Sequence, residues 1–146
     1  MKKFLFITLA ALTVLFGAPA QADIYTGTFS NTAVNGYDTV AYFTQSRPVK
    51  GNKEFSTEWK GAKWNFSSAE NLELFKTNPE KYAPQYGGYC AFAVGHNSLA
   101  AGNPNHWHIE DGKLYLNINE TIQNKWLPRR DELISKADKN FPALSK

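Results

Sequence analysis

Hydrophobic and polar positions alternate most clearly in residues 106–117, where two short runs flank Asp111-Gly112. Asp-Gly between alternating runs is typical of a type I′ turn, so these residues are predicted to form a β-hairpin. A two-residue turn sets the pairing from Glu110 with Lys113 outward to His106 with Asn117. This register gives a core face and an opposite face, formed respectively by Trp107, Ile109, Leu114 and Leu116, and by His106, His108, Tyr115 and Asn117.

Two further extended segments are predicted upstream. Residues 54–66 fit a hairpin with Lys60-Gly61 as its turn. Its outgoing strand alternates polar and aromatic residues, so Trp64 and Phe66 are expected to face the core together. Residues 39–43 are rich in β-branched and aromatic side chains, which favours another strand.

Helix signals follow the first hairpin and recur near the end of the chain. Ser67 with Glu70 three residues later matches a capping box, which predicts a helix from Ser67 that ends at Asn78-Pro79. Residues 120–137 form a second helix candidate, which Pro128 is expected to break or kink. The short apolar stretch 88–94 fits a buried helix or an extended segment.

Hairpins mixed with helices, without strand–helix–strand alternation, predict a small single α+β domain of antiparallel hairpins packed against short helices. The domain is expected to occupy residues 35–146, after a lead-in at residues 23–34. The sequence shows no evident internal repeat.

The first 22 residues have the pattern of a cleaved signal peptide. Lys2 and Lys3 precede an apolar run over residues 4–17, and Ala20-Gln21-Ala22 is a small-residue cleavage signal. We therefore expect cleavage after Ala22, a periplasmic or secreted product and no membrane anchor. Loss of the two lysines lowers the formal net charge from +3 to +1, and no basic cluster remains that indicates nucleic-acid binding.

Cys90 is the only cysteine and lies in the glycine- and aromatic-rich segment 85–96. A single cysteine cannot form an internal disulfide, so it is a buried inert thiol, a reactive thiol, a metal ligand or half of an intermolecular bridge. Gly87-Gly88 would allow backbone amides to approach a thiolate closely. The alternative is a small core residue, because free cysteine is often buried.

All three histidines follow Cys90. His106 and His108 are two residues apart on one predicted strand and could chelate a metal, while His96 lies in a loop. Cys90 with these histidines would suit copper or zinc. Each histidine alone also fits an exposed position without function. Tyr37, Asp38 and Tyr115 are candidate supporting residues, and Asp38 also fits a simple turn-capping role.

Several short motifs resemble the YHS domain. They are Asp38-Thr39-Val40, residues 64–68 and residues 78–82, in that order. Adding residues 86–91, residues 111–117 and Trp126 extends the resemblance to the exported bacterial branch of YHS proteins. That branch includes proteins described as selenoproteins, which implies a redox-active position at Cys90.

The resemblance implies metal handling, but through ligands that this chain lacks at the usual places. Metal-binding YHS members carry cysteines near the end of the aromatic strand and in the first helical turn. The corresponding positions here are Ser67 and Asn71, with Ala41 near the earlier element.

Three functions follow from these observations. The first is an exported YHS-domain protein that binds copper or zinc through Cys90, His96, His106 and His108. The second is a thiol-dependent oxidoreductase in which Cys90 works with an external redox partner. The third is a non-catalytic interaction module in which Cys90 belongs to the core.

Overall fold

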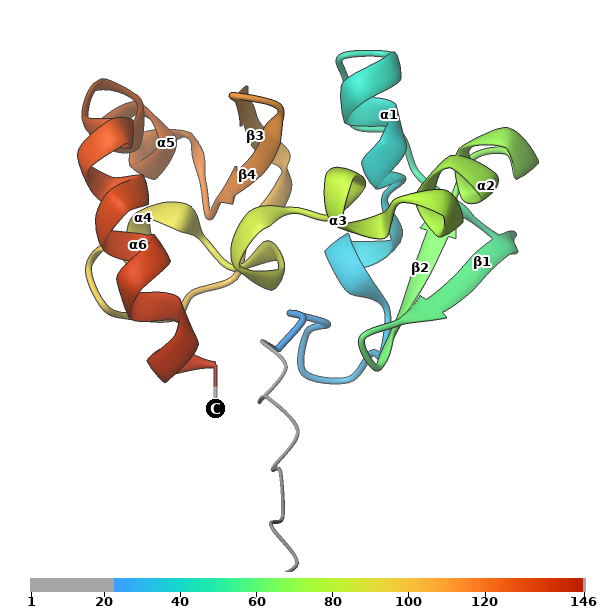
Figure 1. The fold of residues 1–146 in the computed structure, drawn as a ribbon, viewed down its shortest axis with the longest axis horizontal. Helices are drawn as coiled ribbons and strands as arrows, with labels where there is room; N and C mark the ends of the chain where they lie inside the picture. Colours follow the sequence, from blue (N-terminus) through green and yellow to red (C-terminus); the bar gives the residue numbers. More distant parts are fainter. Residues whose placement is uncertain (1–22, 146) are drawn as a thin grey trace, which may run out of the picture.

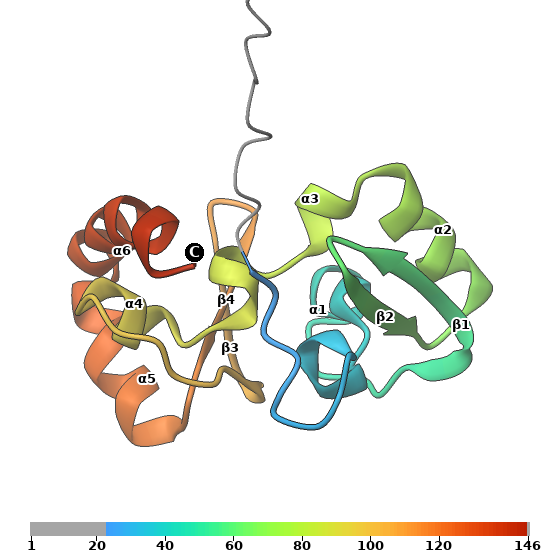
Figure 2. The ribbon, with the colours of Figure 1, turned by 90° about the horizontal axis from the view of Figure 1, so that it is seen from below.

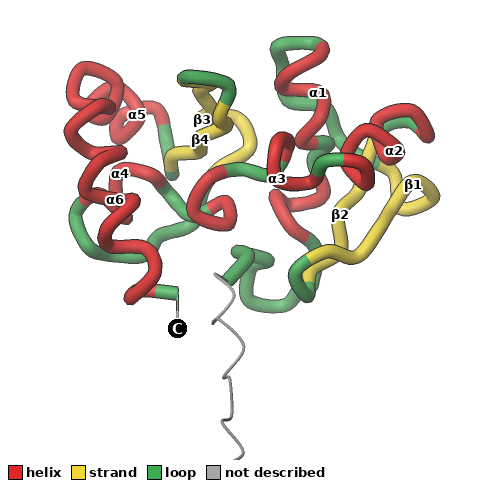
Figure 3. Tube along the Cα trace, viewed as in Figure 1, coloured by secondary structure: helices red, strands yellow, loops and turns green. Residues whose placement is uncertain are grey.

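The computed structural model describes residues 23–145 (Figure 1), so the predicted signal peptide lies outside the described residues. The fold is α+β, as predicted, with two antiparallel hairpins and several short helices. Figure 3 shows that each hairpin is accompanied by its own helices. Within residues 23–145, no helix combines the length and the hydropathy that a bilayer crossing requires.

The elements fall into two consecutive halves, each with one hairpin. In the first half they are η1 (Ala33–Gly36), α1 (Thr39–Thr44), β1 (Asn52–Trp59), β2 (Ala62–Phe66), α2 (Ala69–Thr77) and α3 (Pro79–Tyr82). In the second half they are η2 (Gln85–Gly88), α4 (Ala91–Gly95), β3 (Asn103–Glu110), β4 (Lys113–Asn117), α5 (Glu120–Trp126), η3 (Leu127–Arg129) and α6 (Arg130–Leu144).

The second half repeats the first, which corrects the expectation that the chain has no internal repeat. Both begin with a left-handed 3₁₀ turn and a short helix, followed by a hairpin and further helices. The hairpins share a register irregularity: Asn52 pairs with Phe66, and Asn103 pairs with Asn117, each just before a shift in pairing. Each residue of the second pair lies 51 positions after its counterpart.

The repeat is hard to detect in the sequence because few side chains are shared between the halves. Gly51-Asn52 recurs as Gly102-Asn103, and each hairpin turn ends in glycine. At Gly51 and Gly102 the backbone leaves no room for a side chain: a Cβ atom at Gly51 would lie 2.5 Å from the Asn65 carbonyl carbon. At Gly102 it would lie 2.1 Å from the Gly88 carbonyl oxygen.

The hairpin formed by β3 and β4 lies between two hydrophobic cores. Leu114 and Leu116 point into the core of the first half, where Trp107 and Ile109 also pack, as the predicted register requires. Tyr115 faces the other way, into a core built from α4, α5 and α6. The face carrying His108 and Tyr115 is therefore covered by helices.

Three local predictions were wrong. Residues 39–44 form helix α1 instead of a strand, because the Asp38 carboxylate caps their free backbone amides. The N-cap of helix α2 is Ser68 instead of Ser67, so the helix begins at Ala69. Asn117 pairs with Asn103 instead of His106, because β3 bulges between Asn103 and Trp107.

The lead-in is fastened across both halves. The backbone N–H of Tyr25 donates a hydrogen bond of 2.9 Å to the carbonyl of Gly87, and the Tyr25 ring packs against Tyr89. Ile24 packs against the core of the first half. Figure 2 shows this segment passing between the two halves before it enters η1.

Candidate functional site

Asp38 lies at the entrance of α1 and is completely buried. The turn before it uses left-handed backbone angles at Val34 and Asn35, which redirects the chain into the helix. One carboxylate oxygen of Asp38 accepts hydrogen bonds from the backbone N–H groups of Val40 (2.9 Å) and Ala41 (3.2 Å). The charge thus stabilises the first turn of α1.

The other carboxylate oxygen of Asp38 ties α1 to the start of α2. It accepts hydrogen bonds from the Ser67 backbone N–H (2.8 Å), the Ser67 hydroxyl (2.6 Å) and Asn71 Nδ2 (2.8 Å). Five donors therefore converge on one buried carboxylate, which compensates the cost of removing its charge from water. The sequence singled out these positions separately but did not predict this cluster.

Cys90 occupies the place in the second half that Asp38 occupies in the first. Its backbone N–H donates to the carbonyl of Ala100 at 2.8 Å, as that of Asp38 donates to Val49 at 2.8 Å. The Cys90 residue is only 1% exposed. Its Sγ lies 3.5 Å from Asn117 Oδ1, so the thiol donates a weak hydrogen bond inside the core.

Asn117 is the polar neighbour of Cys90 and is fully buried. Its Oδ1 also accepts a hydrogen bond of 3.1 Å from the backbone N–H of Phe92, which fixes the orientation of the amide. Within residues 23–145, Nδ2 of Asn117 has no hydrogen-bond partner. Cys90 and Asn117 therefore form a small polar pair inside an otherwise apolar core.

His96 is exposed at the end of α4. Its Nδ1 lies 2.8 Å from the carbonyl oxygen of Phe92, and its ring stacks on Phe92 with centroids 4.3 Å apart. His106 lies in the bulged part of β3 and is half-buried.

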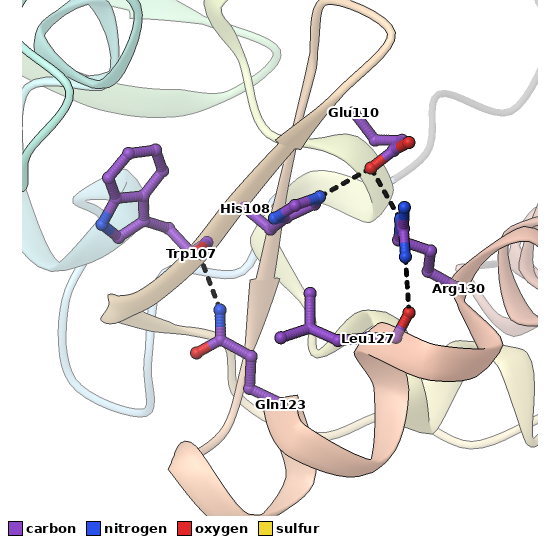
Figure 4. Close-up of polar contacts among 6 residues, drawn as sticks. All are labelled: Trp107, His108, Glu110, Gln123, Leu127 and Arg130. Carbon is purple, nitrogen blue, oxygen red and sulfur yellow. Dashed lines mark hydrogen bonds and ion pairs between the residues drawn. The ribbon is translucent and has the colours of Figure 1, made fainter.

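His108 is held in a charged chain that links β3 to the C-terminal helices (Figure 4). Its Nε2 lies 2.6 Å from Glu110 Oε2, and the same oxygen accepts a hydrogen bond of 2.7 Å from Arg130 Nε. Arg130 in turn donates to the carbonyl of Leu127 at 2.8 Å. The hydrogen bonds from His108 and Arg130 lower the pKa of Glu110 below its usual value.

The predicted metal ligands are not assembled into one site. Residues 23–145 contain no cluster of three or more histidine, cysteine, aspartate or glutamate side chains able to hold a metal ion. Cys90 does face the same side of the hairpin as His108, as a shared site would need. The ring of Trp126, however, packs against both His108 and Tyr115.

The predicted supporting residues are also distributed between the halves. Tyr37 packs against the core of the first half, and Asp38 contacts Ser67 and Asn71. Tyr115 belongs to the second core, where burial raises its pKa to about 12 and keeps its phenol neutral at physiological pH.

Comparison with known proteins gives one match. The family model of the YHS domain matches residues 40–86, from α1 into η2. No curated protein and no solved structure matches the chain significantly. The match begins after Asp38, includes Ser67 and Asn71, and ends before Cys90. Residues 40–86 are thus similar to the YHS domain, a family associated with metal binding.

Proposed function

We propose that the protein is an exported, non-catalytic binding module of the YHS type in which Cys90 has a structural role. The observation that carries the proposal is the burial of Cys90, which is 1% exposed and hydrogen-bonded to Asn117. The neighbouring Ala91, Val94 and Leu116 are buried as well. Export is supported by the signal-peptide pattern of the first 22 residues.

Thiol chemistry fits this environment less well. A thiolate must reach a second sulfur or an oxidant to react, and reactive cysteines are partly exposed and close to positive charge. The side chain that accepts a hydrogen bond from the Cys90 sulfur is a neutral amide, Asn117. The structure thus supports a core residue better than an exchange thiol.

Transition-metal binding is the second candidate, because the YHS family match favours it. In the metal site predicted from the sequence, copper or zinc would be bound by Cys90 with His96, His106 and His108. His96 and His108 already contact Phe92 and Glu110, so this site requires a different arrangement of α4 and β3.

One pair of measurements separates these functions. The first is the labelling rate of Cys90 by a thiol reagent in the folded chain and in denaturant. The second is the stoichiometry of Cu(I) or Zn(II) in wild type, in Cys90→Ala and in a His108→Ala control. We expect labelling only after unfolding, and no metal that depends on Cys90. Rapid native labelling would overturn the proposal in favour of thiol chemistry, and stoichiometric metal lost in Cys90→Ala would favour the metal site.

A further inference from the structure

A half-open cavity of about 160 Å³ lies where the two halves meet. The first half contributes the end of β1, the hairpin turn and α3, while the second half contributes η2 and α6. The residues that define its chemistry are Ile24, Trp59, Lys60, Glu80, Tyr86 and Phe141. Junctions between structural units are common places for small-molecule sites.

The aromatic residues that line the cavity are held in place by ring contacts and by a hydrogen bond. Trp59 packs edge-on against Trp64 and Phe75, with ring centroids 5.6 and 5.7 Å away. From the second half, Tyr86 contacts Phe141 with ring centroids 5.6 Å apart, and the Tyr86 hydroxyl is hydrogen-bonded to Asp138 at 2.9 Å. Rings that are already fixed can bind a flat ligand without a further ordering cost.

The size of the cavity limits the ligand to a single ring. An apolar cavity of about 150 Å³ in another protein accommodates benzene, so a volume of 160 Å³ fits one six-membered ring. Larger ring systems would extend into solvent.

The charged rim favours an anionic group on that ring. Lys60 lies over the Trp59 ring, 4.6 Å from its centroid, and its side chain is 28% exposed. Its partner Glu80 is 78% exposed and 3.8 Å away, which makes a weak and easily replaced ion pair. A ligand carboxylate could therefore replace Glu80 beside Lys60 while its ring enters between the aromatic walls.

We propose that this cavity between the halves binds small single-ring carboxylates, with Lys60 as the counter-ion and Trp59, Tyr86 and Phe141 as the ring-binding walls. This inference names a ligand class for the proposed binding function and rests on that function. It is independent of the state of Cys90.

The test is a titration of the mature protein with benzoate, followed by amide NMR shifts at Lys60, Gly61 and Gly87. Benzyl alcohol and benzylamine are the neutral and cationic comparisons. We expect saturable shifts at these three residues with benzoate, and weaker binding of the other two compounds. Lys60→Met should weaken benzoate binding about two- to fivefold, and Glu80→Gln should strengthen it, because an exposed ion pair contributes up to about 1 kcal/mol.

The matched control is Lys63→Met, which removes an exposed lysine of β2 outside the cavity and should leave benzoate binding unchanged. No saturable shift, equal binding of all three compounds, or an equal loss in the Lys63 variant would overturn the inference. A fast-reacting native thiol would overturn the proposed structural role of Cys90 without affecting this result. Failure of benzoate to bind, with an unreactive thiol, would overturn the cavity assignment alone.

Discussion

Asp38 and Cys90 show how equivalent positions can acquire different chemistry. Each follows a left-handed turn and begins a short helix. The side-chain partners of Asp38 are Ser67 and Asn71, whose counterparts 51 residues later are Ile118 and Ile122. The second half therefore lacks the donors that a buried carboxylate needs, and a weakly polar thiol takes its place.

At the end of each hairpin the polarity is reversed: the first half has an apolar residue there, and the second half has a polar one. Phe66 is an apolar core residue, whereas its counterpart Asn117 bonds to Cys90 and to the Phe92 backbone. Each half thus keeps a polar contact at the start of its first helix, but its partner comes from a different position. Sequence reasoning identified Cys90 as chemically distinctive but could not determine its burial, because that depends on contacts with Leu116 and Asn117 of β4, which are distant in the sequence.

Removing the Asp38 carboxylate should be the most destabilising polar substitution in the first half. Asp38→Ala leaves five hydrogen-bond donors without their acceptor. We expect the free energy of unfolding to fall by about 3–5 kcal/mol, the usual cost of removing one partner from a buried charged network. Denaturant unfolding followed by circular dichroism measures the change.

Ser68→Ala provides the comparison, because it removes a single N-cap hydrogen bond, from the Asn71 backbone, and should cost about 1 kcal/mol. Similar losses for the two variants would show that Asp38 is only a helix cap. In that case the contacts with Ser67 and Asn71 would contribute little to stability.

At the scale of elements, strong local signals predicted the hairpins, and long-range contacts decided the exceptions. Asp111-Gly112 and Lys60-Gly61 form the predicted turns, and four of the five predicted pairs of the second hairpin are present. Residues 39–43 favour a strand by composition, but the cap at Asp38 makes them a helix. The other oxygen of the same carboxylate bonds to Ser67 and Asn71, and the local pattern around residues 39–43 cannot show these distant partners.

The chain from His108 through Glu110 to Arg130 should make the docking of α6 sensitive to acid. Because the folded-state pKa of Glu110 is lowered, its contribution to stability is present above its usual value of 4.5 and is lost as pH falls through the lower folded value. Glu110→Gln should therefore destabilise the protein at neutral pH, and this difference should shrink below pH 4.5.

The measurement is the unfolding midpoint of both proteins between neutral pH and about pH 3, the range in which ordinary carboxyl groups titrate. Glu54→Gln, at an exposed position of β1, is the control for a general effect of charge. A difference between wild type and Glu110→Gln that stays constant down to the lowest pH would contradict a role for this carboxylate.

The repeated glycines before the hairpins should be equally intolerant of a side chain. Gly51→Ala and Gly102→Ala each force a Cβ atom into backbone that cannot move independently. We expect each to lower the free energy of unfolding by about 1–3 kcal/mol or more, as overpacking does. Gly61→Ala has open space around it and should cost only the left-handed backbone strain, about 1–2 kcal/mol.

Thermal unfolding of the three variants tests this expectation. Comparable losses at Gly51 and Gly102 would support the structural equivalence of the halves. A tolerant Gly102 with an intolerant Gly51 would mean that the second half has relaxed this part of the repeat.

For the whole molecule, the repeat and the family match raise the question of whether the first half is an independent domain. Its core is completed by Leu114 and Leu116, and Trp107 and Ile109 pack beside them. All four residues come from the second hairpin. Lead-in residues 24 and 25 also contact both halves. These contacts make the two halves one cooperative structure.

We therefore expect a chain ending at residue 84 not to fold alone, although it contains nearly all of the YHS match. Truncation would expose the side of the first core that β3 and β4 cover, and apolar burial is the main force that folds a small domain. The amide NMR spectrum of this fragment should show poor dispersion. Residues 23–146 should instead unfold in a single cooperative transition. Adding residues 85–146 as a separate chain should restore dispersion. A well-dispersed spectrum of the fragment alone would instead establish the first half as an autonomous domain to which the second half was added as a partner.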